Sequence, residues 1–324
     1  MKHNPALDGV RGLAISLVLL FHFFGWRGGW IGVDVFFCLS GYLITSILRS
    51  EIEASGRIDF RRFYWRRFVR LAPALFLVSA ALLAWSRFSS HGAAIRSSVW
   101  VAILYLQNWA APLGLAGRDL SMGHTWSLST EEQFYLLWPL LLPLVIRSRR
   151  PLLLLGWAIV LMMTAKAIAA IDGVSDWWLI YSLPLRPVGL IVGCWIAFAP
   201  IKLWRFAWAP ALLGLVLMAL SVGQQGDVLA AFGASCLAAV LILGAPPGFA
   251  IWPLRYLGRI SYGLYLYHWP IVVLGDGHAS RWALLALSLI AAALSFEFIE
   301  KPCLRLKGAG LRSTARMRLS VDCK

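Results

Sequence analysis

The chain has 324 residues, of which 60% are hydrophobic and only 14% are charged. An ordinary soluble domain carries about 25% charged residues, so this composition excludes a soluble globular protein and predicts an integral membrane protein. The net charge of +15 would suit nucleic acid or anionic lipid, but the basic residues occur in short blocks between apolar segments, as membrane topology places them. We therefore expect membrane lipid as a partner and no nucleic acid.

Apolar stretches long enough to cross a hydrocarbon core of about 30 Å follow one another along almost the whole chain. We expect about ten transmembrane helices, at residues 8–26, 31–48, 71–87, 127–146, 152–171, 177–198, 207–223, 228–245, 257–275 and 282–299. The stretch 95–111 is shorter and polar in part, which predicts a re-entrant or interfacial segment. The fold class is therefore all-α and polytopic, with residues 1–304 as one membrane domain and 305–324 as a basic, poorly ordered cytoplasmic tail.

The basic blocks predict the orientation of these helices. The densest runs from Arg49 to Arg70, and others lie at 147–150 and from Lys301 onward, whereas the connectors 175–178 and 275–278 contain no Lys or Arg. Cytoplasmic loops are enriched in these residues, so we expect both termini to be cytoplasmic, in a bacterial-type cytoplasmic or inner membrane. If 95–111 crossed the membrane, every later basic block would lie on the other side.

The first apolar stretch carries two costly side chains, Arg11 and His22. They are separated by three helical turns plus about 20°, so both project from one face, about 16 Å apart along the axis. Arg11 could merely reach lipid phosphates, and His22 could merely bond a neighbouring helix. Ionisable groups at membrane depth are nevertheless functional by default, and the shared face favours a common role.

Further polar groups are expected on the same side as His22. Asp34 starts the second span, His124 and Glu131 open the fourth, Arg186 lies within the sixth, and His268 lies in the outer half of the ninth. Ordinary structural roles remain open for several neighbours. Glu132 fits a capping box with Ser129, His268 could be an interfacial belt residue, and Ser40 with Gly41 could serve close helix packing.

At the other end, the sequence "RRFYWRRFVRLAP" places Arg62, Arg66 and Arg70 on one helical face, with Arg67 nearby. Anchoring to anionic lipid is one explanation. A site for a phosphorylated cytoplasmic ligand is the other, because guanidinium groups match phosphate oxygens. The five cysteines are scattered and show neither a disulfide pattern nor a metal-ligand spacing, so no metal is expected.

Six motifs in order carry a resemblance: "LDGVRGLAISLVLLFHF", "GVDVFFCLSGYLI", "RRFVRLAP", "HTWSLSTEEQFYLLWP", "SYGLYLYHWPI" and "FEFIEKP". Together they resemble the membrane acyltransferase 3 family, which acylates sugars and related hydroxyl compounds. The resemblance covers residues 5 to 304 and implies a ten-helix enzyme that takes an acyl group, usually acetyl, from cytoplasmic acyl-CoA to an acceptor on the other side. The family's arginine and histidine map onto Arg11 and His22, and its basic motif onto Arg66, Arg67 and Arg70.

The chemistry fits these residues. Esterifying a sugar hydroxyl needs a base, and imidazole suits that task, so His22 is the expected base; it could instead accept the acyl group and relay it. Arg11 would hold or orient the donor, and the arginines 66, 67 and 70 would bind the CoA head. Glu131 and Asp34 are further catalytic candidates, and these two and His268 are candidates for holding His22 or the acceptor. His124, Arg186 and His268 would contact a sugar or polysaccharide acceptor.

A polytopic transporter or flippase for a polar glycan is the alternative, since it also needs polar groups within ten helices. It predicts internal repeats, and none is visible in the sequence.

Overall fold

The computed structural model describes residues 4–115, 121–223 and 227–305, and within them every regular element is a helix. The longer helices are α1 (Pro5–Phe24), α2 (Gly32–Ser55), α3 (Phe60–Trp85), α6 (Trp126–Arg147), α7 (Pro151–Ile171), α11 (Val228–Gly244), α12 (Trp252–Gly275) and α13 (Arg281–Ser295). The shorter ones are α4 (Gly92–Ile103), α5 (Gln107–Ala110), α8 (Asp176–Tyr181), α9 (Val188–Phe198), α10 (Trp208–Ser221) and α14 (Lys301–Arg305). The predicted all-α class is confirmed for this part of the chain. The expected tail, 305–324, lies outside the described residues except for Arg305.

Five segments of the described chain are long and apolar enough to cross a membrane: Pro5–Phe24, Gly29–Ser55, Phe60–Trp85, Pro151–Ile171 and Arg281–Arg305. Four further apolar helices, among them α10 and α11, have between 10 and 17 residues. The protein is thus an integral membrane protein. The number of ten crossings stays a prediction, because these shorter helices do not reach a full span by length alone.

Two predicted segments are broken in the structure. The stretch 95–111 is divided between α4 and α5, and α4, with its 12 residues, is about 18 Å long at 1.5 Å per residue. The predicted single helix 177–198 is wrong, because α8 ends at Tyr181 and α9 begins only at Val188. Pro184 and Pro187 lie between them, and proline removes a backbone donor and disfavours helix in the residue before it.

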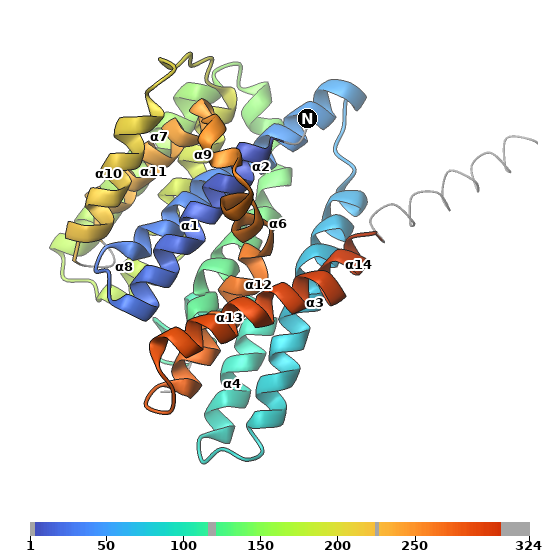
Figure 1. Ribbon diagram of the computed structural model, residues 1–324. Helices are drawn as coiled ribbons and strands as arrows, with labels where there is room; N and C mark the ends of the chain where they lie inside the picture. Colours follow the sequence, from blue (N-terminus) through green and yellow to red (C-terminus); the bar gives the residue numbers. More distant parts are fainter. Residues whose placement is uncertain (1–3, 116–120, 224–226, 306–324) are drawn as a thin grey trace, which may run out of the picture.

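Glycines let two pairs of helices approach closely. A Cβ atom at Gly12 of α1 would overlap the carbonyl of Leu254, which lies on α12, and one at Gly258 of α12 would overlap the carbonyl of Asp8. Gly41 of α2 meets the carbonyl of Leu190 on α9 in the same way, which confirms its predicted packing role. Small residues at such contacts are typical of membrane helices, and Figure 1 shows α1 in blue and α12 in orange near the middle of the bundle.

The bundle has two chemically different ends. We call the end where α2 passes into α3 the basic end, since Arg57, Arg61 and Arg62 are exposed there. The middle of α6 lies beside the start of α3, because the hydroxyl of Tyr64 on α3 donates to the carbonyl of Leu136 at 3.0 Å. The opposite end, where α1 ends, is called the histidine end.

The orientation is testable with two exposed positions. We expect Ser55→Cys, at the basic end, to be cytoplasmic, and Ala279→Cys, in the loop between α12 and α13, to face outward. Each substitution is made in a variant without native cysteines, and a membrane-impermeant maleimide is added to intact cells. The reagent should label the Ala279→Cys variant strongly and the Ser55→Cys variant only after permeabilisation. The reverse pattern would contradict the orientation predicted from charge.

Candidate functional site

His22 and His268 meet at the histidine end of the bundle. His22 lies in the last turn of α1, His268 lies on α12, and the distance from His268 Nε2 to His22 Nδ1 is 3.0 Å. The other ring nitrogen of His268, Nδ1, faces the carbonyls of Leu264 at 3.1 Å and Tyr265 at 2.8 Å. Close packing of α1 on α12 through glycine is what brings the two imidazoles together.

These contacts assign the tautomers of two neutral imidazoles. A carbonyl oxygen only accepts hydrogen bonds, so His268 Nδ1 must carry its hydrogen and its Nε2 must accept. His22 Nδ1–H therefore donates to His268, and His22 Nε2 has no hydrogen-bond partner among the described residues. The hydrogen bond fixes the orientation of the His22 ring, as a partner orients an imidazole in a catalytic triad.

His124 completes a group of three histidines. It lies in a 3-10 turn (Gly123–Thr125) ahead of α6, and its ring centroid is 5.5 Å from that of His268 and 5.3 Å from that of Tyr265. Burial, together with the neighbouring His268 and His22, lowers the pKa of His124 well below its usual range, so the imidazole is neutral at pH 7. No group of three or more metal-ligating side chains in a suitable arrangement occurs among the described residues.

A cavity of about 430 Å³ opens beside these histidines, and we call it the histidine cavity. It is lined mainly by aromatic and polar side chains, namely His22, Trp30, His124, Trp126, Trp177, Tyr181, Arg186, Tyr265 and Trp269. Its volume is within the range of small-molecule sites, roughly 300–1,000 Å³. Indole and phenol rings provide flat apolar faces with a polar edge, which suits a ring-shaped ligand rich in hydroxyl groups.

Asp34 and Arg186 form a buried ion pair next to the histidine cavity. Both terminal nitrogens of Arg186 reach the carboxylate, Nη1 to Oδ1 and Nη2 to Oδ2, the latter at 2.9 Å. The two side chains are 0% and 2% exposed, and the guanidinium lies 5.4 Å from the ring of Trp30. The carboxylate of Asp34 thus orients Arg186, whereas the partner of His22 is His268.

A second cavity, of about 160 Å³, lies toward the basic end, and we call it the arginine cavity. Its polar lining comes from six elements or turns and comprises Arg11, Ser40, Arg67, Arg70, Tyr105, Ser127, Glu131, Glu132, Tyr135, Ser261, Tyr262 and Tyr265. Three arginines and two glutamates therefore converge on one hollow. Arg66, which the sequence grouped with them, is exposed on α3 and is not part of this lining.

The two glutamates of the arginine cavity have different partners. Arg67 donates to Glu132 at 2.6 Å, and its guanidinium lies 3.3 Å from the ring centre of Tyr135. Ser40 donates to Glu131 at 2.7 Å. The predicted capping box is wrong: α6 begins at Trp126, and Glu132 pairs across to α3 instead of with its own helix start.

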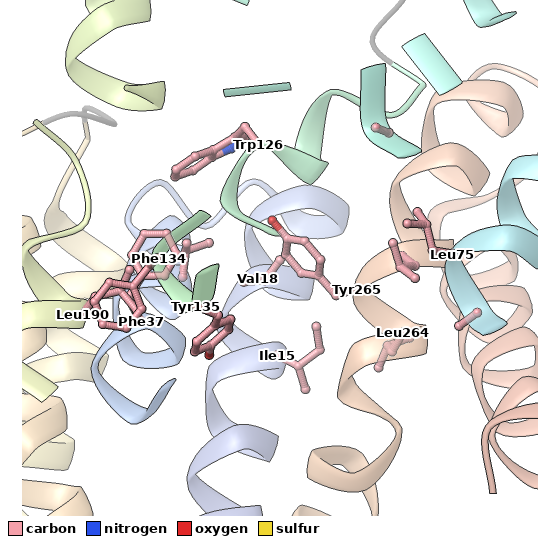
Figure 2. Close-up of a cluster of buried hydrophobic side chains, with 14 of the residues drawn as sticks. Ile15, Val18, Phe37, Leu75, Trp126, Phe134, Tyr135, Leu190, Leu264 and Tyr265 are labelled. Carbon is pink, nitrogen blue, oxygen red and sulfur yellow. The ribbon is translucent and has the colours of Figure 1, made fainter. Parts of the chain in front are cut away.

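Tyr265 of α12 lines both cavities, as does Val33. The hydroxyl of Tyr265 donates to the carbonyl of His124 at 2.8 Å and lies 2.6 Å from Ser127 Oγ. Figure 2 shows Tyr265 within the buried cluster that also holds Val18 and Trp126. The two cavities are thus neighbours across one aromatic wall.

The predicted face of α1 is confirmed by the cavities. Arg11 lines the arginine cavity and His22 lines the histidine cavity, so one helix face reaches both. Sequence reasoning missed the tyrosines at 105, 262 and 265. For Tyr262 and Tyr265 the signal was the tyrosine spacing in "SYGLYLYHWP", since they recur at the helical i, i+3 interval that puts them on one face.

Comparison with known proteins gives relatives over nearly the whole chain. Residues 4–299 match the acyltransferase domain. Peptidoglycan O-acetyltransferase OatA of Listeria monocytogenes is 32% identical, covering 93% of this chain and 56% of its own length. Putative peptidoglycan O-acetyltransferase YrhL of Bacillus subtilis is also 32% identical, covering 97% of this chain and 56% of its own length.

O-acetyltransferase OatA of Staphylococcus aureus is 27% identical, covering 95% of this chain and 58% of its own length. The chain thus spans a little over half the length of these relatives. No solved structure matches it. Since the acyltransferase domain extends over residues 4–299, the chain belongs to the membrane acyltransferase 3 family.

Proposed function

We propose that the protein is a membrane O-acyltransferase that moves an acyl group, in the simplest case acetyl, from cytoplasmic acyl-CoA to a hydroxyl of a sugar or polysaccharide acceptor. The observation that carries this proposal is the pair of cavities on the two sides of Tyr265. One cavity has the charge for a phosphorylated donor. The other has the aromatic walls for a hydroxylated acceptor and the His22 imidazole, whose Nε2 has no partner in the described part of the chain.

The arginine cavity supports the donor end. Arg11, Arg67 and Arg70 line it at the basic end of the bundle, and guanidinium groups recognise phosphate oxygens in a fixed fork geometry. Arg67 is already paired with Glu132, which leaves Arg70 as the arginine best placed for a phosphate of CoA. Arg11 is deeper and orients the thioester end of the donor.

His22 supports the acceptor end. Its Nε2 lone pair takes the proton of the acceptor hydroxyl as that oxygen attacks the thioester carbonyl. The new carbon–oxygen bond forms, the carbon–sulfur bond breaks, and the proton passes from His22 to the departing thiolate. Since His268 accepts a hydrogen bond from His22 Nδ1–H, it stabilises the positive charge that His22 carries in between.

Two alternatives make different predictions. An acyl-enzyme route would place the acyl group on His22 Nε2 before the acceptor arrives, and a trapped acylated peptide would distinguish it. A transporter or flippase of a polar glycan is not favoured, because the relatives are named acetyltransferases. Acyl transfer is tested directly by incubating membranes that contain the protein with acetyl-CoA and a peptidoglycan fragment; the proposal requires a product that is heavier by one acetyl group.

Donor binding gives a matched pair of variants. Arg70→Ala should raise the KM for acyl-CoA by about 10- to 100-fold, because it removes one charged hydrogen bond, which contributes about 1.5–3 kcal/mol. Arg66→Ala removes a neighbouring arginine of α3 that is outside the cavity lining and should change this KM less than twofold. The KM for the acceptor should stay unchanged in both variants. Equal effects of the two substitutions would favour a general role in lipid anchoring.

A further inference from the structure

Trp177 lies at the mouth of the histidine cavity. It is 48% exposed, more than any other described side chain that lines this cavity. Elsewhere in the lining, Trp30, Trp126 and Tyr265 are at most 9% exposed. Trp177 follows Asp176, the first residue of the short helix α8. A ligand that enters the cavity from outside therefore passes close to this indole.

Three aromatic rings lead from this mouth into the cavity, and we call them the aromatic wall. The rings of Trp177 and Tyr181 are stacked, with centroids 5.3 Å apart and planes 20° apart, and the i, i+4 spacing puts both residues on one face of α8. The Tyr181 ring meets Trp126 edge to face, with centroids 5.2 Å apart. Exposure falls from Trp177 through the half-buried Tyr181 to the buried Trp126. The aromatic wall therefore extends without a break from the mouth to the interior.

The inner end of the aromatic wall is held by neighbouring groups. The guanidinium of Arg186 lies 5.6 Å from the Trp126 ring and is itself paired with both carboxylate oxygens of Asp34. The ring of Phe37 also meets Trp126 edge to face, with centroids 6.1 Å apart. Aromatic rings that are fixed in this way supply contact area at a low cost in conformational entropy. The aromatic wall is therefore largely preformed for a ligand.

The turn beside the mouth lies at the membrane surface and not in hydrocarbon. Residues 172–175, between α7 and α8, are exposed throughout, and so is Asp176 at the start of α8. Charged side chains such as Asp172 and Asp176 are costly in hydrocarbon, so this turn contacts water. A ligand from the aqueous phase can therefore reach Trp177. Tryptophan also anchors proteins at membrane interfaces, and that role is the alternative that the experiment has to separate.

We infer that the acceptor is a chain of several sugars, one of which lies beside His22 while another stacks on Trp177. This inference rests on the proposed function, because it names the class of acceptor at the same site. A sugar ring has an apolar face of C–H groups, and an indole offers a flat apolar surface to it. His22 and Trp177 line one cavity, so a single chain can contact both, whereas a monosaccharide fills only one of the two positions.

Binding to the full chain in detergent tests the inference, with dissociation constants measured by native mass spectrometry. The probes are the peptidoglycan fragments of the transfer assay, cut to one sugar and to four sugars. The wild type should bind the four-sugar probe at least about 10-fold more tightly, the order of effect of one aromatic stacking contact. Trp177→Ala should remove most of this advantage and change the affinity for the one-sugar probe less than about twofold. Trp177→Phe keeps an aromatic face and should give an intermediate advantage.

The adjacent tryptophan of α8 provides the matched control. Trp178 is outside the lining of the histidine cavity, and its ring meets that of Trp109 instead, so Trp178→Ala should keep the preference for four sugars. Equal weakening of both probes by Trp177→Ala, or no change in either, would assign Trp177 to the membrane interface and overturn the inference, as would equal binding of the two probes by the wild type. Because the readout is binding, a preference for four sugars without acyl transfer would contradict the proposed function alone.

Discussion

Replacing His22 with alanine is expected to lower kcat for acyl transfer by about 10²- to 10⁴-fold, the usual loss when a general base is removed. The KM for acyl-CoA should change little, because the arginine cavity is lined by other residues. Alanine is easier to place in a bilayer than histidine, so the variant should accumulate in the membrane as the wild type does. The measurement is initial-rate kinetics at equal protein amounts.

Two variants make the His22 result interpretable. His278→Ala changes an exposed histidine in the loop after α12 and should keep full activity. His268→Ala removes the acceptor of the His22 Nδ1–H bond and should lower kcat by a smaller factor, about 10- to 100-fold, since the base survives but loses its orientation. Near-wild-type transfer by His22→Ala would refute its role as base, and the chemistry would then have to lie at His124 or His268.

Asp34→Ala is expected to lower the stability of the folded protein strongly. This change leaves the guanidinium of Arg186 buried without its counter-ion, and breaking one side of a buried pair costs about 3–5 kcal/mol. The detergent-solubilised variant should therefore unfold at a clearly lower temperature than the wild type. Because the substitution destabilises the folded state itself, the lower unfolding temperature should be seen without substrate.

The ion pair can be removed from both sides as a control. Asp34→Leu combined with Arg186→Met leaves no buried charge at the pair and should recover most of the lost stability, as replacing whole buried pairs often does. Glu53→Ala breaks an exposed pair with Arg49 and should cost no more than about 1 kcal/mol. If Asp34→Ala unfolded at the wild-type temperature, the pair would contribute nothing to the fold.

Much of the candidate site was predictable because helix periodicity is local. Arg11 and His22 lie on one face at any packing arrangement, since about 100° per residue fixes their directions, and they line adjacent cavities. The arginines of α3 could be placed on one helix in the same way. Periodicity alone could not say that Arg70 lines the cavity while Arg66 does not, because both belong to the same broad face.

The break between α8 and α9 could also be predicted in part from the sequence. Pro184 and Pro187 stand in the predicted span 177–198, and two prolines so close in a helix interior are unfavourable. Hydropathy averages over such a segment and treats it as one apolar stretch. The loop that results places Arg186 at the histidine cavity.

By itself, the sequence determined the class of protein, its family and the common face of Arg11 and His22, because composition, ordered motifs and helical period need no knowledge of neighbours. Only the tertiary structure decided which side chains meet. In the structure His268 is hydrogen-bonded to His22, and Arg186 forms an ion pair with Asp34. Arg67 forms an ion pair with Glu132, which the sequence predicted to cap its own helix. Such pairs depend on how closely the helices approach one another. Here the approach is set by glycine contacts such as that between Gly12 and Leu254, two residues more than two hundred positions apart in the sequence.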